Sequence, residues 1–218
     1  DRLRQMCRQD ILHALALHAW FTPEEVSFLW DLGVPMVSIG RRYPGNCPCV
    51  MQDTGADAAT LAGFFTQNGC RAVAILRGFV NPAARQTNTD VGWQCVDILT
   101  AAGIAAGGDM VYTHADEEEL DETAASGILT NMLARHPEVD GLLLAAPAFP
   151  AAFRVWRESA SARPLHVAAI TDGSVDLDIP ALRLPITEIG REAGKLLLGQ
   201  MANGRESVTS RFVPSIWI

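Results

Sequence analysis

The feature that most restricts the fold of this chain is the alternation of short apolar runs with longer amphipathic stretches, which continues almost from end to end. Runs rich in Val, Ile, Leu and Ala are typical of strands buried on both faces, and such strands occur in parallel sheets covered by helices. The alternation therefore predicts an α/β fold of doubly wound parallel sheets. Strands are expected over residues 12–20, 35–40, 48–52, 71–76, 109–114, 140–146, 166–171 and 211–218, and residues 181–186 lead into the last helix.

Helix start and stop signals lie between these runs. Thr22 stands before a proline, which is the pattern of an N-cap followed by the first helical position, and Gly33 closes the same helix. A second helix is expected to begin at Thr54 and to close on Gly69. The acidic run 116–122 is interpreted as a solvated first turn, where carboxylates favour the helix dipole. Helices are expected over residues 22–33, 54–68, 83–102, 119–135, 149–161 and 187–204.

Size and charge exclude several classes of function. With 218 residues, 49% of them hydrophobic, the chain can build one large α/β domain or two smaller lobes. A net charge of −8 repels a phosphate backbone, so this chain is not expected to bind nucleic acid by itself. The apolar runs are shorter than a membrane span and the start is polar, so we expect no membrane contact and a cytoplasmic location.

The cysteines and the short motifs give no sign of catalysis. Five cysteines form an odd set without the spacing of a disulfide framework, which favours reduced thiols. Cys47 and Cys49 form a close pair, but no second Cys or His pair stands nearby to complete a zinc site. The motifs GxSxG, GxxxxGK[ST] and HExxH are absent. No catalytic residue, metal or cofactor is therefore expected.

Residues that directly follow the expected strands are the candidates for ligand binding, because parallel sheets bind ligands at the carboxyl ends of their strands. Asp172 is the most conspicuous, since a strand buried on both faces does not need an acid at its end. A carboxylate accepts two hydrogen bonds from adjacent hydroxyls, but a helix N-cap or a turn before Gly173 would also explain Asp172. Both interpretations stay open. The full set is Trp20, Gly40, Arg41, Gln52, Asp53, Arg77, His114, Ala146, Pro147 and Asp172.

The order and spacing of several motifs resemble the effector-binding domain of the LacI/GalR family of bacterial transcription regulators. These motifs are GVPMVSIG, VMQDTGADAATLAGFFTQNGCRAVAILRG, VGWQCVDILTAAGI, HPEVDGLLLAA, HVAAITDGS, PALRLPITEIGREAGKLLLGQMANG and SRFVPSIWI. The resemblance covers nearly the whole chain. It implies the fold of periplasmic binding proteins, in which two parallel lobes are joined by crossovers, here near Gln52, Leu184 and Ser207, with a small effector between them. One lobe would hold residues 1–52 and 185–206, and the other residues 53–184 and 207–218.

The resemblance also implies partners and a mechanism. Family members carry an amino-terminal helix-turn-helix that binds operator DNA, and their effector domain opens with a further strand and helix; neither is in this sequence. They form homodimers, for which Trp30 and Trp156 are interface candidates unless they are ordinary core residues. An effector would change the angle between the lobes and so alter DNA affinity.

Two alternatives stay open. One is a periplasmic solute-binding receptor of the same fold, which a signal peptide in place of a helix-turn-helix would indicate. The other is an α/β enzyme whose site contains Asp172 and His114, which requires both groups to approach a common atom of the substrate.

Several positions depart from the family's sugar-binding pattern. Thr89 replaces an arginine commonly found three residues before the glycine of a GF or GW pair, and Arg85 is the nearest cation. Ala146 and Pro147 replace an Asn-Asp pair, Gly40 and Arg41 replace an acid, and Leu184 replaces a polar residue. A sugar hydroxyl bound without a partner costs about 1–3 kcal/mol, so an acidic or partly apolar effector is favoured over a neutral hexose. The expected effector contacts are Trp20, Arg41, Gln52, Arg85, Thr89, Ala146 and Asp172.

Overall fold

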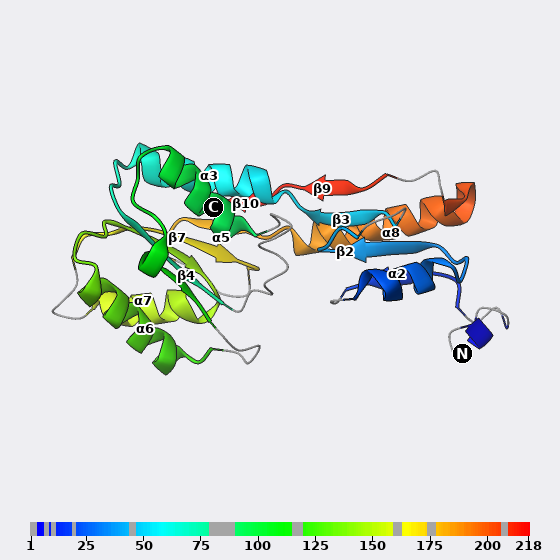
Figure 1. The fold of residues 1–218 in the computed structure, drawn as a ribbon, viewed down its shortest axis with the longest axis horizontal. Helices are drawn as coiled ribbons and strands as arrows, with labels where there is room; N and C mark the ends of the chain where they lie inside the picture. Colours follow the sequence, from blue (N-terminus) through cyan, green and yellow to red (C-terminus); the bar gives the residue numbers. More distant parts are fainter. Residues whose placement is uncertain are drawn as a thin grey trace. The chain divides into compact units, whose positions relative to one another are not determined.

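The structure is a computed structural model, and the chain divides into two compact units that are considered separately (Figure 1). Unit 1 comprises Asp1–Asp53 and Pro185–Pro214, and unit 2 comprises Thr54–Leu184 and Ser215–Ile218. Within these units the structure describes residues 4–6, 9, 12–18, 21–43, 47–78, 90–114, 120–158, 163–173, 178–205 and 209–218.

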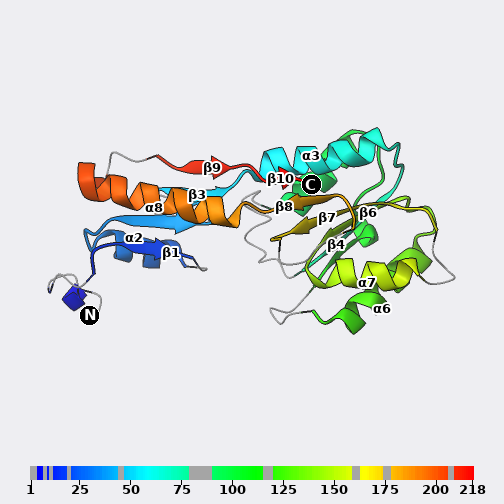
Figure 2. The same cartoon turned by 180° about the vertical axis from the view of Figure 1, so that it is seen from behind.

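Unit 1 contains a parallel sheet with the strand order β1-β2-β3-β9. Side chains alternate between its two faces, so Met36 packs with helix α2 (Pro23–Trp30) and Val37 packs with helix α8 (Ile186–Asn203). Figure 2 shows α8 lying along β2 and β3, which it contacts. The strands are β1 (Leu15–Leu17), β2 (Met36–Ile39), β3 (Cys49–Gln52) and β9 (Arg211–Val213).

The start of α2 is fixed by a capping box, as its sequence predicts. The Glu25 N–H donates to Thr22 Oγ1 at 3.2 Å, and the Thr22 N–H donates to Glu25 Oε2 at 2.7 Å. Past the other end of the helix, Gly33 has a φ of +83°, a left-handed conformation that favours glycine. The predicted helix signals at both ends are confirmed.

Unit 2 contains a larger sheet with the strand order β10-β8-β7-β6-β4-β5. Its neighbouring strands are parallel except for the edge strand β10, which runs antiparallel to β8. The strands are β4 (Val73–Arg77), β5 (Val111–Thr113), β6 (Gly141–Ala145), β7 (His166–Thr171), β8 (Ala181–Arg183) and β10 (Ile216–Trp217). The predicted α/β class with parallel sheets is confirmed.

Two pairs of helices cover the two faces of this sheet (Figure 1). Helices α3 (Thr54–Gln67) and α5 (Val91–Ala101) bury Ile75 and Leu143 on one face. Helices α6 (Glu122–Arg135) and α7 (Ala148–Arg157) bury the alternate residues Leu76 and Leu144 on the other. The strands of unit 2 are therefore apolar on both faces, and chemistry is left to the residues at their ends.

Two helices begin later than the sequence analysis expected, because an aspartate caps each of them. Asp121 accepts a hydrogen bond from the Ala124 N–H at 2.7 Å, so α6 begins at Glu122 and not at residue 119. Asp90 has the same role for α5, so that helix begins at Val91, whereas the sequence analysis started it at residue 83; residues 79–89 lie outside the described part. The acidic run thus contributes the cap of α6 and its first residue.

The chain ends in two strands, although a single strand was predicted over residues 211–218. Strand β9 pairs with β3 in unit 1, whereas β10 pairs with β8 in unit 2. Pro214 stands between them, and it has no N–H to donate to a continuous ladder. Residues 211–213 therefore belong to the sheet of unit 1, whereas the sequence analysis had placed them in the other lobe.

No helix among the described residues combines the length and the apolar character that crossing a bilayer requires.

Candidate functional site

The carboxyl ends of five neighbouring strands form one edge of the sheet in unit 2, which we call the carboxyl edge. The strand register places Arg77 of β4 level with Thr113 of β5 and Ala145 of β6. It likewise places Thr171 of β7 level with Arg183 of β8. The predicted positions His114, Ala146 and Asp172 directly follow three of these strands.

Arg77 is a buried cation at this edge. Its side chain is only 2% exposed, and its Nη2 lies 2.6 Å from Asp90 Oδ2, in an ion pair whose acid is 14% exposed. Sequence reasoning considered Arg77 as a cation for the effector, and the structure places it in contact with an acid of its own chain. A buried guanidinium requires such a partner, since an unpaired charge away from water is strongly unfavourable.

Asp90 joins this ion pair to the first turn of α5. Its Oδ1 accepts a hydrogen bond from the Trp93 N–H at 2.9 Å, which makes Asp90 the N-cap of the helix. The Arg77 guanidinium also lies over the Trp93 ring, 5.1 Å from its centroid. A Cβ on Gly92 would stand 3.0 Å from Arg77 Nε, so this glycine allows the guanidinium to lie close to the helix backbone.

Sequence reasoning missed both Asp90 and Trp93 as parts of the edge. An aspartate directly before the apolar run at Val91 is a recognisable N-cap signal and could have located the helix start. The ion pair itself has no sequence signal, because it joins residues from two different elements.

His114 and Asp172 do not share one part of the edge. His114 follows the edge strand β5, Asp172 follows β7, and β4 and β6 lie between these strands. Neighbouring strands are about 4.8 Å apart, so β5 and β7 are separated by roughly 14 Å. The His114 N–H donates to the Arg77 carbonyl at 3.1 Å, and its Nδ1 lies 3.3 Å from the Tyr112 hydroxyl.

Asp172 lies exposed in the turn that follows β7. Thr171 Oγ1 accepts a hydrogen bond from the Gly173 N–H at 3.0 Å, and Gly173 has a φ of +87°. A Cβ on Gly173 would lie 3.2 Å from Arg183 Cδ, so the stem of Arg183 passes along this turn. Arg183 was missed because the end of β8 was left out of the candidate set.

Ala146 is part of the packing at the start of α7. It is buried, its carbonyl accepts a hydrogen bond from the Phe149 N–H at 3.2 Å, and a Cβ on Gly78 would stand 3.3 Å from its own Cβ. A larger polar side chain would have little space here. The Asn-Asp pair that the family pattern leads one to expect is thus replaced by a small apolar contact.

Two of the expected effector contacts, Arg41 and Gln52, lie at the carboxyl ends of the strands in unit 1. Arg41 follows β2, where Ser38 Oγ donates to the Arg41 carbonyl at 2.6 Å and the Arg41 guanidinium lies 5.0 Å from the centroid of the Tyr43 ring. Gln52 is the last residue of β3, level with Val213 of β9, and is partly exposed. Trp20, Arg85 and Thr89 lie outside the described residues.

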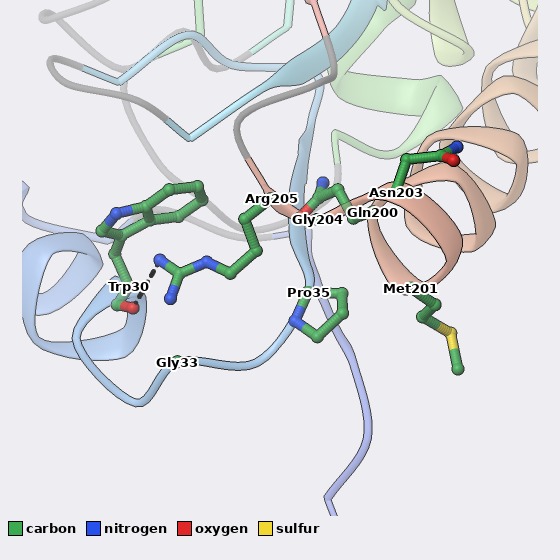
Figure 3. Close-up of a pocket in the computed structure, with 8 residues that line it drawn as sticks. All are labelled: Trp30, Gly33, Pro35, Gln200, Met201, Asn203, Gly204 and Arg205. Carbon is green, nitrogen blue, oxygen red and sulfur yellow. Dashed lines mark hydrogen bonds between the residues drawn. The ribbon is translucent and has the colours of Figure 1, made fainter.

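An open pocket of about 930 Å³ lies at the opposite end of the unit 1 sheet, where β2 begins and where α2 and α8 end (Figure 3). Arg205 Nη2 donates to the Trp30 carbonyl at 2.7 Å, and the guanidinium lies 3.7 Å from the centroid of the Trp30 ring. The pocket is lined by Trp30, Gly33, Pro35, Gln200, Met201, Asn203, Gly204 and Arg205. It lies at the other end of the strands from Arg41 and Gln52.

The two tryptophans considered as interface anchors have different surroundings. Trp30 forms a wall of this pocket, whereas Trp156 is buried and stacks on Phe153 at 5.8 Å. Trp156 is thus an ordinary core residue.

The Cys47 and Cys95 thiols are not suited to nucleophilic chemistry. Burial raises the pKa of Cys95 to about 12 and that of Cys47 to about 11, so both are protonated at neutral pH. Throughout the described part of the chain, no group of three or more His, Cys, Asp or Glu side chains is placed to hold a metal ion.

Comparison with known proteins gives matches in structure alone. No protein-family model and no curated protein matches the sequence. A LacI family transcriptional regulator from Bifidobacterium animalis subsp. lactis has a similar structure, with a TM-score of 0.80 and 15% identity, over 100% of this chain and 80% of that one. The Escherichia coli transcriptional repressor ascG is similar over 98% of this chain and 79% of its own, with a TM-score of 0.77 and 16% identity.

A third similar structure was solved with a small molecule bound. It is the Cra transcriptional dual regulator from Pseudomonas putida in complex with fructose 1-phosphate, with a TM-score of 0.74 and 17% identity, over 100% of this chain and 81% of that one. The chain therefore has the fold of LacI-family transcriptional regulators, and the resemblance seen in the sequence is confirmed at the level of the fold.

Proposed function

We propose that the chain is the effector-binding and dimerisation domain of a LacI/GalR-type transcription regulator. The observation that carries the proposal is the similarity of fold along the whole chain to transcriptional regulators, among them a LacI family member. One similar regulator was solved with fructose 1-phosphate and another, CelR, with cellobiose. The carboxyl ends of the strands in both sheets fit this role, since polar side chains such as Gln52, Arg77 and Asp172 stand at or directly after them.

The effector would act by binding two states of the domain with different affinity. Such a ligand shifts the population toward the state that it prefers, and DNA affinity changes if the two states differ in how they hold the DNA-binding segment. Operator DNA would be contacted by a helix-turn-helix outside these 218 residues, since a net charge of −8 opposes direct binding. The domain would work as a homodimer.

We expect the effector to be acidic or partly apolar. Ala146 offers no hydrogen bond from its side chain, whereas Arg41 and Arg183 bring positive charge to the ends of β2 and β8. The effector would leave chemically unchanged. The Cys47 and Cys95 thiols are protonated, which disfavours nucleophilic attack by either of them. His114 and Asp172 follow β5 and β7, which are too far apart for these two side chains to act on one atom as an acid-base pair.

A thermal-shift screen of the purified chain tests this proposal. The compounds would be neutral hexoses, cellobiose, sugar acids, sugar phosphates and nucleosides, since a ligand that binds only the folded state raises the melting temperature. We expect sugar phosphates or sugar acids to raise it more than their neutral parents. Stabilisation by neutral hexoses alone would contradict the expected effector class, and no stabilisation by any compound would count against effector binding.

A further inference from the structure

We infer that Arg77 is the anion-recognition group of the carboxyl edge, and that the carboxylate or phosphate of an acidic effector takes the place of Asp90 beside it. This inference rests on the proposed function, because it names the chemical class of the effector and the side chain that selects it. It also replaces the simpler idea that Arg77 reaches the ligand directly as an unpaired cation.

The place of the ion pair points to a role beyond folding. Arg77 is the last residue of β4, at the edge where parallel sheets bind ligands, and every other residue of that strand is apolar. A buried ion pair is weak evidence of stabilisation, because well-packed apolar residues of similar volume often serve equally well. A buried cation at this position is therefore better explained by a ligand that needs it.

Asp90 is the partner that an anion can replace. Its side chain is 14% exposed whereas that of Arg77 is 2% exposed, so Asp90 is the more accessible member of the pair. Asp90 divides its two oxygens, giving Oδ2 to Arg77 and Oδ1 to the Trp93 N–H. A free carboxylate or phosphate can offer two oxygens to the planar guanidinium, which is the stronger arrangement.

Replacement of Asp90 by an anion beside Arg77 would also affect the start of α5. When Asp90 leaves Arg77, the same carboxylate is drawn away from the Trp93 N–H, and the helix loses its N-cap. Gly92 lets the ion pair lie against this first turn, because a Cβ there would stand 3.0 Å from Arg77 Nε and 3.2 Å from Asp90 Oδ1. The Trp93 ring, which lies against the guanidinium, provides a spectroscopic signal of the change.

The first test follows the Trp93 amide in the wild-type chain. Amide hydrogen exchange is measured with and without a sugar phosphate, such as fructose 1-phosphate, and with the neutral disaccharide cellobiose. Binding of an anionic compound is expected to speed exchange at Trp93, because Asp90 no longer accepts its hydrogen bond. An anionic ligand that binds and leaves this exchange rate unchanged overturns the inference while the proposed function stands.

The second test removes the competing charge. Asp90→Asn keeps a capping oxygen for Trp93 and removes the carboxylate that lies beside Arg77, so inorganic phosphate should bind about tenfold or more tighter than to wild type. Titration calorimetry measures this gain, and Trp93 fluorescence follows it. The matched control is Asp178→Asn, which removes the acid of the exposed pair with Arg157 and should produce no gain.

A double variant identifies the cation. Arg77→Met combined with Asp90→Asn should lose the phosphate binding that Asp90→Asn gains. Retention of that binding, or absence of any gain in a folded Asp90→Asn variant, overturns the inference. If Asp90→Asn does not fold, the wild-type exchange measurement decides. The two proposals can fail separately. If phosphate binds to Asp90→Asn through Arg77 but no screened compound binds to the wild type, Arg77 is supported as an anion site. That outcome counts against the proposed function alone.

Discussion

The Gln200 side chain forms hydrogen bonds with both backbone groups of Met36, the first residue of β2. Gln200 Nε2 donates to the Met36 carbonyl at 2.7 Å, and Gln200 Oε1 accepts from the Met36 N–H at 2.9 Å. Gln200 comes from the last turn of α8 and is buried, although it is 164 residues from Met36 in the chain. The amide thus joins the sheet of unit 1 to the helix that covers it.

Replacing Gln200 by Leu should destabilise unit 1. The substitution leaves the buried Met36 N–H and carbonyl without these partners, and each unsatisfied group costs about 1–3 kcal/mol. Urea denaturation followed by tryptophan fluorescence measures the loss. Met201→Ala, on the exposed side of the same turn, should stay within about 0.5 kcal/mol of wild type. Equal stability of the two variants would show that the Gln200 bonds contribute nothing net.

Removing the cap of α2 should have a smaller effect on stability. Thr22→Ala deletes the oxygen that accepts from the Glu25 N–H and should cost about 1 kcal/mol. Ser27→Ala, at an exposed position within the helix, is the matched control. The same urea midpoint for Thr22→Ala and for Ser27→Ala would mean that the capping box does not determine where this helix begins.

Breaking the Arg77–Asp90 pair on one side should cost more than removing it entirely. Arg77→Met leaves a carboxylate without its cation and should destabilise unit 2 by about 3–5 kcal/mol. Adding Asp90→Asn should recover most of that loss, since no uncompensated charge then remains. A double-mutant cycle in urea measures the coupling. Simple addition of the two single effects would rule out an energetic link between these side chains.

Stability should fall in alkaline solution because of Cys95. Burial raises the pKa of its thiol from 9.0 to about 12, so the folded chain holds this proton more tightly than the unfolded chain. The resulting stabilisation is complete below pH 9 and is lost as the pH rises toward 12. Melting temperatures between pH 8 and pH 11 should decline less steeply for Cys95→Ala than for wild type. Identical slopes would contradict a raised thiol pKa.

Local signals in the sequence predicted much of the fold. The Thr22 cap and the helix-closing glycines Gly33 and Gly69 depend on neighbouring residues, and both glycines have the positive φ that a helix end favours. The apolar runs identified the strands for a similar reason, since burial on both faces determines their composition. The strand ends, where we looked for ligand contacts, followed from the parallel topology.

Contacts between distant elements could not be predicted in this way. The Asp90–Arg77 pair and the bonds from Gln200 to Met36 depend on how the elements pack, and no sequence spacing encodes either. The division of the last strand at Pro214 was visible as a proline, but assigning its halves to different sheets required the structure. For the same reason Arg183 could be recognised at the carboxyl edge only once β8 had been placed beside β7.

The most direct test of the central claim is a calorimetric titration of the wild-type chain with the best compound from the thermal-shift screen, followed by chemical analysis of the recovered compound. We predict saturable binding that weakens in Asp172→Ala and a compound recovered unchanged. Binding that is unaffected by Asp172→Ala would remove that residue from the effector site. Conversion of the compound during the titration would contradict the account, because the chain would then be an enzyme and not a sensor.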